Sequence, residues 1–155
     1  MTSTTPMPSV ADFMSRNVHT LRPEAEISDA VGVLTRYLCS GAPVLDEGGG
    51  ILGVLTHEGC MQAMSGAVFN GEEAGRVADH MAREFAVIEP TADLFRVVSM
   101  FSNQCGRRVL VVDVGRVVGI VTRSDTLRAL HQLRQPRTSD ITIESVALGW
   151  SALTP

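Results

Sequence analysis

Two stretches of the chain carry apolar residues at the spacing of an amphipathic α-helix. In each stretch the apolar positions recur at i, i+3, i+4, i+7 and i+11, which places them on one face of a helix. The first set is Ile27, Ala30, Val31, Leu34 and Leu38, and the second is Leu94, Val97, Val98, Phe101 and Cys105. A brief extended piece, at 19–21 and 86–88, precedes each stretch and is closed by Pro23 or Pro90, because proline biases the residue before it away from helical geometry.

Two short apolar runs follow each predicted helix, and each pair is joined by a glycine-containing turn of hairpin composition. The pairs are 43–46 with 51–55 and 109–113 with 117–121. We expect a further helix after each pair, at 57–64 and 124–133, and a short amphipathic turn before each extended piece, at 10–15 and 77–82. The pattern predicts an α/β (α+β) fold of two β-α-β-β-α units, with small sheets flanked by helices.

The two units are copies of one another. Ten residues between positions 10 and 46 recur 67 positions later, and Gly53 and Thr56 recur 66 positions later as Gly119 and Thr122. A repeat of this length indicates a duplicated structural unit. We expect an N-terminal arm at 1–9, a first unit at 10–64, an exposed linker at 65–76 pinned down by Phe69, a second unit at 77–133 and a tail at 134–155. The tail is expected to be partly extended or disordered, as a frayed terminus or as a strand added to a sheet edge.

The composition is typical of a self-sufficient cytoplasmic domain. A chain of 155 residues can bury roughly 70% of its unfolded surface. The three cysteines, Cys39, Cys60 and Cys105, lack a Cys-x-x-Cys spacing, so free thiols in a reducing compartment are expected. The first residues lack the basic start and apolar run of a signal peptide, and no apolar stretch has membrane-spanning length. We therefore expect a cytoplasmic protein without a membrane partner.

The net charge of −4 is unevenly distributed along the chain. Residues 1–76 hold four arginines against nine acidic residues, a balance of −5, whereas residues 77–155 hold nine against eight, a balance of +1. All thirteen basic residues are arginine, whose planar guanidinium suits carboxylate and phosphate, although a compositional bias of the genome would also produce this. The balance offers no broad basic face, so no nucleic-acid partner is expected.

The stretch Gly119–Asp125 joins an apolar strand to the first turn of a helix, and its chemistry has two interpretations. Thr122 and Asp125 could form a capping box that satisfies amides at the helix start. Alternatively, the helix N-terminus could favour phosphate while the carboxylate accepts from ribose hydroxyls. The equivalent stretch Gly53–Gly59 has glycine in place of the acid. A hydrogen bond to a charged group is worth roughly 1.5–3 kcal/mol, so this first site is expected to bind about tenfold to a thousandfold more weakly.

Several motifs occur twice and together resemble those of the CBS-domain family. They are a helical turn ending in methionine (Val-Ala-Asp-Phe-Met and Val-Ala-Asp-His-Met), a Thr/Val-x-x-Pro step, a strand ending in aspartate and a Gly-x-x-Thr-x-x-Asp close that is complete only in the second unit. The match covers residues 10–133. The resemblance implies a Bateman module in a stand-alone protein of bacterial type: two CBS units packed with pseudo-twofold symmetry, two clefts between them, adenosine-containing ligands and, commonly, a homodimer.

The resemblance also assigns residues to the two clefts. Asp125 would hold the ribose, Thr122 and Arg123 would lie near the phosphate, and the backbone around Val87 would meet the adenine. The predicted main site comprises Val87, Ile88, Pro90, Arg107, Arg108, Thr122, Arg123 and Asp125. The two consecutive arginines are either extra phosphate contacts or an exposed basic strand start. A possible weak second site comprises Thr20, Leu21, Pro23, Pro43, Thr56 and His57.

The chain departs from the family pattern at two positions of the adenine end. Val87 stands where the family often has threonine, and Leu110 stands where it often has proline. Both changes leave backbone contacts to an adenine possible.

Catalytic motifs are absent from the sequence. There is no His-x-x-x-His pair, no Gly-x-Ser-x-Gly elbow and no Walker-type loop, since the chain has no lysine. We therefore expect no enzymatic activity, no metal site and no required cofactor.

The leading functional hypothesis is a sensor that binds AMP, ADP, ATP or S-adenosylmethionine in the cleft of the second unit. The first alternative is a ligand-free CBS dimerisation module, in which Thr122 and Asp125 only cap a helix. The second is a regulator of an unknown protein partner, acting through the acidic first unit and through Glu72 and Glu73 of the linker.

Overall fold

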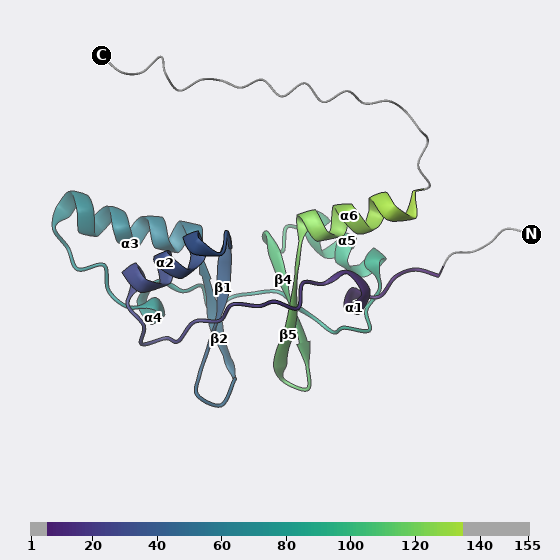
Figure 1. The fold of residues 1–155 in the computed structure, drawn as a ribbon, viewed down its shortest axis with the longest axis horizontal. Helices are drawn as coiled ribbons and strands as arrows, with labels where there is room; N and C mark the ends of the chain where they lie inside the picture. The colour runs from purple at the N-terminus through teal and green to yellow at the C-terminus, as the bar shows by residue number, and fades with distance from the viewer. Residues whose placement is uncertain (1–5, 135–155) are drawn as a thin grey trace, which may run out of the picture.

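The computed structural model describes residues 6–134, which form two halves of similar design side by side (Figure 1). The first half contains α2 (Ile27–Arg36), β1 (Gly41–Leu45), β2 (Ile51–Thr56) and α3 (His57–Asn70). The second half contains β3 (Val87–Ile88), α5 (Leu94–Ser102), β4 (Arg108–Asp113), β5 (Arg116–Thr122) and α6 (Arg123–Leu133). Two short helices, α1 (Val10–Phe13) and α4 (Val77–His80), precede the halves in the sequence. The predicted fold class and duplicated unit are confirmed.

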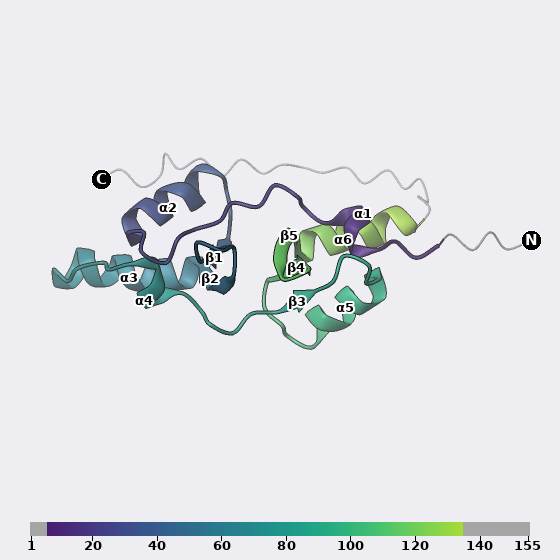
Figure 2. The same ribbon diagram turned by 90° about the horizontal axis from the view of Figure 1, so that it is seen from below.

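Each half is built around one hairpin. β1 pairs with β2 and β4 pairs with β5, both antiparallel, while β3 joins β4 in parallel. The extended piece predicted at 19–21 contributes only a parallel bridge between Leu21 and Val44. Figure 2 shows the two hairpins next to each other in the middle of the molecule, with α2 and α3 on one outer side and α5 and α6 on the other. The sheets therefore meet across the centre, and the helices cover their outer faces.

The short helices are exchanged between the halves. Val10 of α1 is fully buried in the apolar cluster of the second half, where its amide donates to the Ala92 carbonyl at 2.7 Å. Val77 of α4 is fully buried in the cluster of the first half, where its amide donates to the Ala25 carbonyl at 2.9 Å. The boundaries predicted at 64 and 77 thus separate the two copies of the sequence repeat but not the two packed cores. Each core is completed by a short helix that precedes the other half in the sequence.

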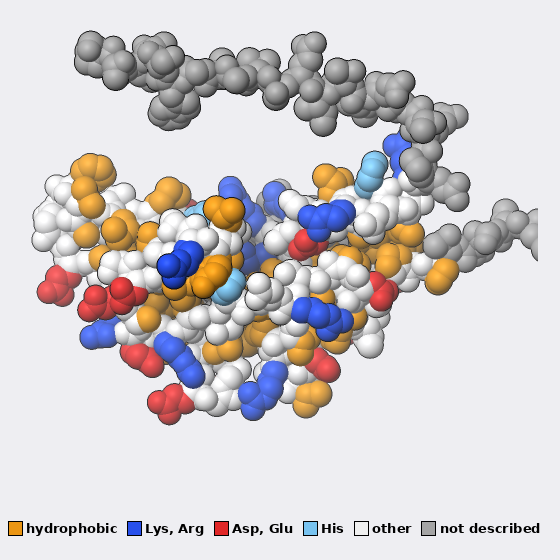
Figure 3. All heavy atoms as spheres, in the orientation of Figure 1, with side chains coloured by type: hydrophobic (Ala, Val, Ile, Leu, Met, Phe, Trp, Pro, Cys, Tyr) orange, Lys and Arg blue, Asp and Glu red, His pale blue; other side chains and the backbone are white. Residues whose placement is uncertain are grey.

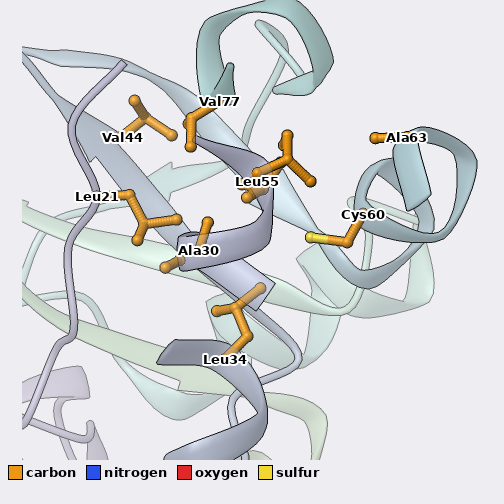
Figure 4. Packing of buried hydrophobic residues seen from close by; sticks show 10 residues of the cluster. Leu21, Ala30, Leu34, Val44, Leu55, Cys60, Ala63 and Val77 are labelled. Carbon is orange, nitrogen blue, oxygen red and sulfur yellow. The ribbon is translucent and has the colours of Figure 1, made fainter. Parts of the chain in front are cut away.

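The apolar faces of α2 and α5 form the cores as their spacing predicts. In the first half Leu34 of α2 packs with Leu55 of β2 and Val77 of α4 (Figure 4), and all three side chains are at most 1% exposed. Leu38, the last position of the predicted stripe, is an exception. It is 92% exposed and has φ 53°, because α2 ends at Arg36 and the chain turns before that position.

The segment predicted as a linker is partly helical. α3 continues to Asn70 and ends where Gly71 adopts a left-handed φ of 68°, its amide donating to the Gly66 carbonyl. Left-handed glycine is a common helix terminator. The prediction of an exposed loop from residue 65 is therefore wrong for residues 65–70. The expectation that Phe69 pins this segment down is also wrong, since its side chain is 82% exposed.

Some expectations lie outside the described residues. The strand addition expected within the tail and the arm residues 1–5 both fall there, so they stay predictions. Within the described part of the chain, no helix combines the length and hydrophobicity that crossing a bilayer requires.

Candidate functional site

A hollow of about 540 Å³ lies where strands of the two halves end near the molecular centre. The ends of β2 and the starts of α3 and β4 surround it; its lining residues are Ser40, Thr56, His57, Glu58, Met61, Gly106, Arg107 and Arg108. Basic side chains gather in the depression between the halves (Figure 3). A volume of this size is within the range of small-molecule sites. We call this feature the central hollow.

A narrower space of about 120 Å³ continues from the central hollow and shares Thr56, Gly106, Arg107 and Arg108 with it. Its remaining walls are mostly apolar and come from β2, from the segment before β3 and from the start of β4; they are Val54, Ala82, Glu84, Phe85, Ala86, Cys105 and Leu110. We call this space the apolar slot. A charged entrance next to an apolar slot suits a ligand with one ionic and one aromatic part.

Arg108 reaches across the centre from β4 to the first half. Its Nη2 donates to Ser40 Oγ at 2.6 Å. Gly41 makes room for it, because a Cβ at that position would lie 2.5 Å from Arg108 Nη1 and 2.6 Å from the Leu55 carbonyl oxygen. Burial lowers the pKa of the Arg108 guanidinium, and the neighbouring charge of Arg107 lowers it further.

No carboxylate within residues 6–134 forms an ion pair with either arginine. The ion pairs in that part of the chain join Arg96 to Glu89 and Arg128 to Asp125. Desolvation and a like charge both disfavour a buried cation, and a bound anion would relieve both costs. The pair Arg107 and Arg108 is therefore suited to an anionic group such as phosphate.

The N-terminus of α3 forms another wall of the central hollow. Thr56 is its N-cap, and Thr56 Oγ1 accepts from the Gly59 amide at 3.2 Å. The His57 amide donates to the Ser40 carbonyl at 3.2 Å. The positive end of the helix dipole adds to the potential of the two arginines, while the exposed Glu58 side chain opposes it.

The equivalent junction at α6 is a complete capping box. Asp125 Oδ2 accepts from the Thr122 amide and from Thr122 Oγ1, both at 2.9 Å, and the Asp125 amide donates to Thr122 Oγ1 at 3.2 Å. Asp125 Oδ1 accepts from Arg128 Nη1 at 3.2 Å, and the Asp125 side chain is 14% exposed. Both carboxylate oxygens are thus engaged within α6. A carboxylate has about four acceptor positions, so these bonds leave capacity for a ligand hydroxyl.

Gly59, the counterpart of Asp125, lies against α4. A Cβ at position 59 would meet the His80 carbonyl oxygen at 2.7 Å, a separation that requires the backbone of α4 to move. His80 itself is held by its Nε2, which lies 2.8 Å from the Ala74 carbonyl oxygen. In the first half a side chain can therefore be added only at the cost of moving α4, at the position where the second half carries its acid.

The structure distributes the predicted site residues differently from the sequence assignment. It brings Arg107 and Arg108, assigned to the main site, together with Thr56 and His57, assigned to the second site. Arg108 is also the partner of Thr122 in the β4–β5 ladder, so the N-terminus of α6 adjoins the central hollow. Asp125 is not among the residues that line the central hollow or the apolar slot.

The other predicted residues lie elsewhere. Ile88 and Leu21 are core residues, Pro43 is buried in β1, and Val87 is 47% exposed. The carbonyls of Pro23 and Pro90 accept from amides of α4 and α1, Thr20 lines a separate hollow at the β1–β2 turn, and Arg123 borders a groove between α5 and α6.

Sequence reasoning missed the residues that join the two halves. Ser40, Met61, Phe85 and Ala86 carry no motif, and only the packing of one half against the other brings them to the hollow and the slot. No group of three or more His, Cys, Asp or Glu side chains within residues 6–134 is arranged to hold a metal ion.

Comparison with known proteins identifies the family. The model of the CBS domain matches the chain twice, at residues 10–66 and 77–132. An uncharacterized protein of Methanocaldococcus jannaschii is 27% identical over 78% of this chain and 42% of its own length. An A-adding tRNA nucleotidyltransferase of Geobacter sulfurreducens is 30% identical over 81% of this chain and 14% of its own length. The chain thus spans less than half of these two relatives.

Solved structures show the same arrangement. The crystal structure of CBSX2 in complex with AMP has a TM-score of 0.72 and 25% identity, covering 82% of this chain and 98% of that one; a curated relative of that name is from Arabidopsis thaliana. The CBS domain pair of protein MJ0100, in complex with 5′-methylthioadenosine and S-adenosylmethionine, has a TM-score of 0.73 and 25% identity, covering 83% of this chain and all of that one. The protein belongs to the CBS-domain family and contains two CBS domains in tandem.

Proposed function

We propose that this CBS pair is a regulatory module that binds an adenine nucleotide, with the nucleotide phosphate against Arg107 and Arg108 in the central hollow. The observation that carries the proposal is the pair of arginines that faces the N-terminus of α3 without a carboxylate partner in the described residues. CBSX2 in complex with AMP and the CBS pair of MJ0100 in complex with S-adenosylmethionine support an adenosine-containing ligand for this fold.

The charge of the central hollow favours a nucleotide over S-adenosylmethionine. AMP, ADP and ATP place negative phosphate oxygens on the ligand, whereas S-adenosylmethionine carries a positive sulfonium. Two arginines and a helix N-terminus attract the former and repel the latter. We expect AMP, ADP or ATP to bind more tightly than S-adenosylmethionine or 5′-methylthioadenosine.

The nucleoside can extend from the phosphate in two directions. The apolar slot offers walls for a base, with Glu84 as the acid among its lining residues, but position 59, the counterpart of Asp125, is glycine. The N-terminus of α6, next to Arg108 in the sheet, offers Asp125 as a ribose acceptor. We propose the α6 direction, with Asp125 sharing its carboxylate between the helix cap and a ribose hydroxyl.

Calorimetry on the purified protein tests the phosphate site and the ribose site separately. Replacing both arginines (Arg107→Ala with Arg108→Ala) should weaken AMP binding by roughly tenfold to a hundredfold or more, because charge-assisted hydrogen bonds of about 1.5–3 kcal/mol are lost. Asp125→Ala should also weaken it at least tenfold, and Arg116→Ala, an exposed arginine at the far end of β5, is the matched control.

The outcomes distinguish the alternatives. Undiminished affinity in the double arginine variant would refute the phosphate site, and undiminished affinity in Asp125→Ala would place the nucleoside in the apolar slot instead. If no adenine nucleotide binds the wild-type protein, the ligand-free dimerisation module stands, a function favoured by the capping box that is complete without a ligand.

CBS-pair proteins are generally regulatory, and they commonly form dimers. We propose that this chain has no catalytic activity of its own, that it forms a homodimer through α3 and α6, and that it works in the cytoplasm, where its three free cysteines stay reduced. Equilibrium sedimentation at micromolar concentration tests the dimer, and a monomer would contradict it.

A further inference from the structure

Two consecutive arginines line the central hollow, but the fold holds them differently. Arg107 is exposed, and its side chain has no hydrogen-bond acceptor within residues 6–134. Arg108 is half-buried, and its Nη2 donates to Ser40 Oγ at 2.6 Å. One guanidinium is therefore held in place by the other half of the molecule, whereas its neighbour is anchored to nothing in the described part of the chain.

Ser40 stands on a backbone that is itself held in place. Its carbonyl accepts from the His57 amide at 3.2 Å, which ties it to the start of α3. The next residue, Gly41, begins β1 and is paired with Thr56 of β2. The Ser40 hydroxyl is thus presented from a fixed position, and its removal leaves these backbone contacts intact.

The Arg108 side chain is confined at both of its ends. At its Cα it belongs to the β4–β5 ladder, where it is the partner of Thr122. At its guanidinium it lies against Gly41, because a Cβ at position 41 would be 2.5 Å from Arg108 Nη1 and 2.8 Å from its Cζ. The guanidinium therefore fills the space that any larger residue at position 41 would need.

The confined guanidinium still has donors to offer an anion. Ser40 Oγ is its one acceptor among the described residues, so most N–H donors of the guanidinium remain unused. Binding a ligand with a long side chain normally carries an entropic cost for ordering that side chain. At Arg108 most of this ordering has already taken place on folding.

We infer that Ser40 is a positioning residue, whose hydroxyl holds the Arg108 guanidinium in the geometry that receives the nucleotide phosphate, while Arg107 contributes charge without a fixed geometry. This inference rests on the nucleotide site of the proposed function and assigns different roles to its two arginines. Arg108 acts as a planar fork, which lysine does not reproduce, whereas Arg107 acts as a point charge, which lysine does.

Lysine substitutions test the two roles by calorimetry with AMP. Arg108→Lys should weaken AMP binding by about tenfold or more, because an ammonium group cannot reproduce the bidentate contact of a planar guanidinium. Arg107→Lys keeps the charge and should change the affinity by less than about threefold. Equal losses in the two variants, or a larger loss in Arg107→Lys, would overturn the division of roles.

Substitutions of Ser40 test the positioning itself. Ser40→Ala should weaken AMP binding about twofold to tenfold, since a long side chain must then be ordered during binding. Ser40→Thr keeps the hydroxyl and should restore an affinity within about twofold of wild type. The affinity for adenosine, which lacks the phosphate, should be the same in Ser40→Ala as in wild type. Ser99→Ala, which removes an exposed serine of α5 away from the central hollow, is the matched control.

A double-mutant cycle separates positioning from a general structural effect. If Ser40 acts through Arg108, Ser40→Ala should have no further effect on AMP affinity in an Arg108→Ala background. Wild-type AMP affinity in Ser40→Ala, the same loss in both backgrounds, or an equal loss for adenosine would overturn the positioning role and leave the nucleotide site standing. Absence of AMP binding by the wild-type protein would overturn both the positioning role and the proposed site.

Discussion

Adding one methyl group at Gly59 should destabilise the protein, whereas the same change at Gly32 should stabilise it. Both glycines lie within helices, Gly32 in the interior of α2 and Gly59 in the first turn of α3, so both substitutions to alanine gain helix propensity, up to about 0.5–1 kcal/mol. They differ in their surroundings. A Cβ at Gly32 has no heavy atom within 4 Å, whereas a Cβ at Gly59 would meet the His80 carbonyl oxygen at 2.7 Å.

The difference in stability between Gly59→Ala and Gly32→Ala reports mainly the free-energy cost of moving α4. Overpacking of this kind costs about 1–3 kcal/mol, and 1 kcal/mol shifts the melting temperature of a chain this long by about 2–4 °C. Gly59→Ala should therefore melt about 2–12 °C below Gly32→Ala in a thermal scan followed by circular dichroism. Equal melting temperatures would refute the close packing of α4 on α3. Gly59→Asp should be less stable still and should not create a ribose acceptor, because its side chain starts from the same obstructed Cβ.

Two further predictions concern single side chains. Asp125→Ala should lower the free energy of unfolding by about 0.5–2 kcal/mol in urea denaturation even without nucleotide, since it removes the acid of the capping box; no change would mean that the box adds nothing to stability. Burial raises the pKa of the Cys60 thiol, so the folded state keeps its proton at a pH where the unfolded chain, with a thiol pKa near 8.5, begins to lose it. The stability contributed by the neutral thiol should be present below about pH 8.5 and lost as the pH rises toward the folded-state value; if Cys60→Ala loses as much stability as wild type between pH 7.5 and 9.5, that linkage is wrong.

The repeat made the fold predictable from the sequence. The helical stripes that include Leu34 and Val97, the two hairpins and the duplication all follow from residue periodicity, because each depends on neighbours close in the chain. The predicted end of α3 failed for a local reason. The sequence offers a possible helix terminator at both Gly66 and Gly71. Only Gly71 adopts the left-handed backbone that ends the helix.

The candidate site was predictable in part. The arginine pair and the Thr122–Asp125 junction stand out as motifs, and so does the missing acid at Gly59. The sequence did not predict which of these residues share one hollow. The central hollow is lined by both halves, and it brings Thr56 of one half together with Arg107 of the other.

The sequence by itself determined two similar units, their helices and strands, and an acid in only one of the two strand-to-helix junctions. Only the tertiary structure decided which half each short helix completes, which residues surround the central hollow and why a side chain at position 59 is costly. These features depend on contacts between segments far apart in the chain, such as Arg108 with Ser40 and Gly59 with His80. Periodicity describes which face of a segment is buried, but the partner that buries it is chosen by the packing of the whole chain.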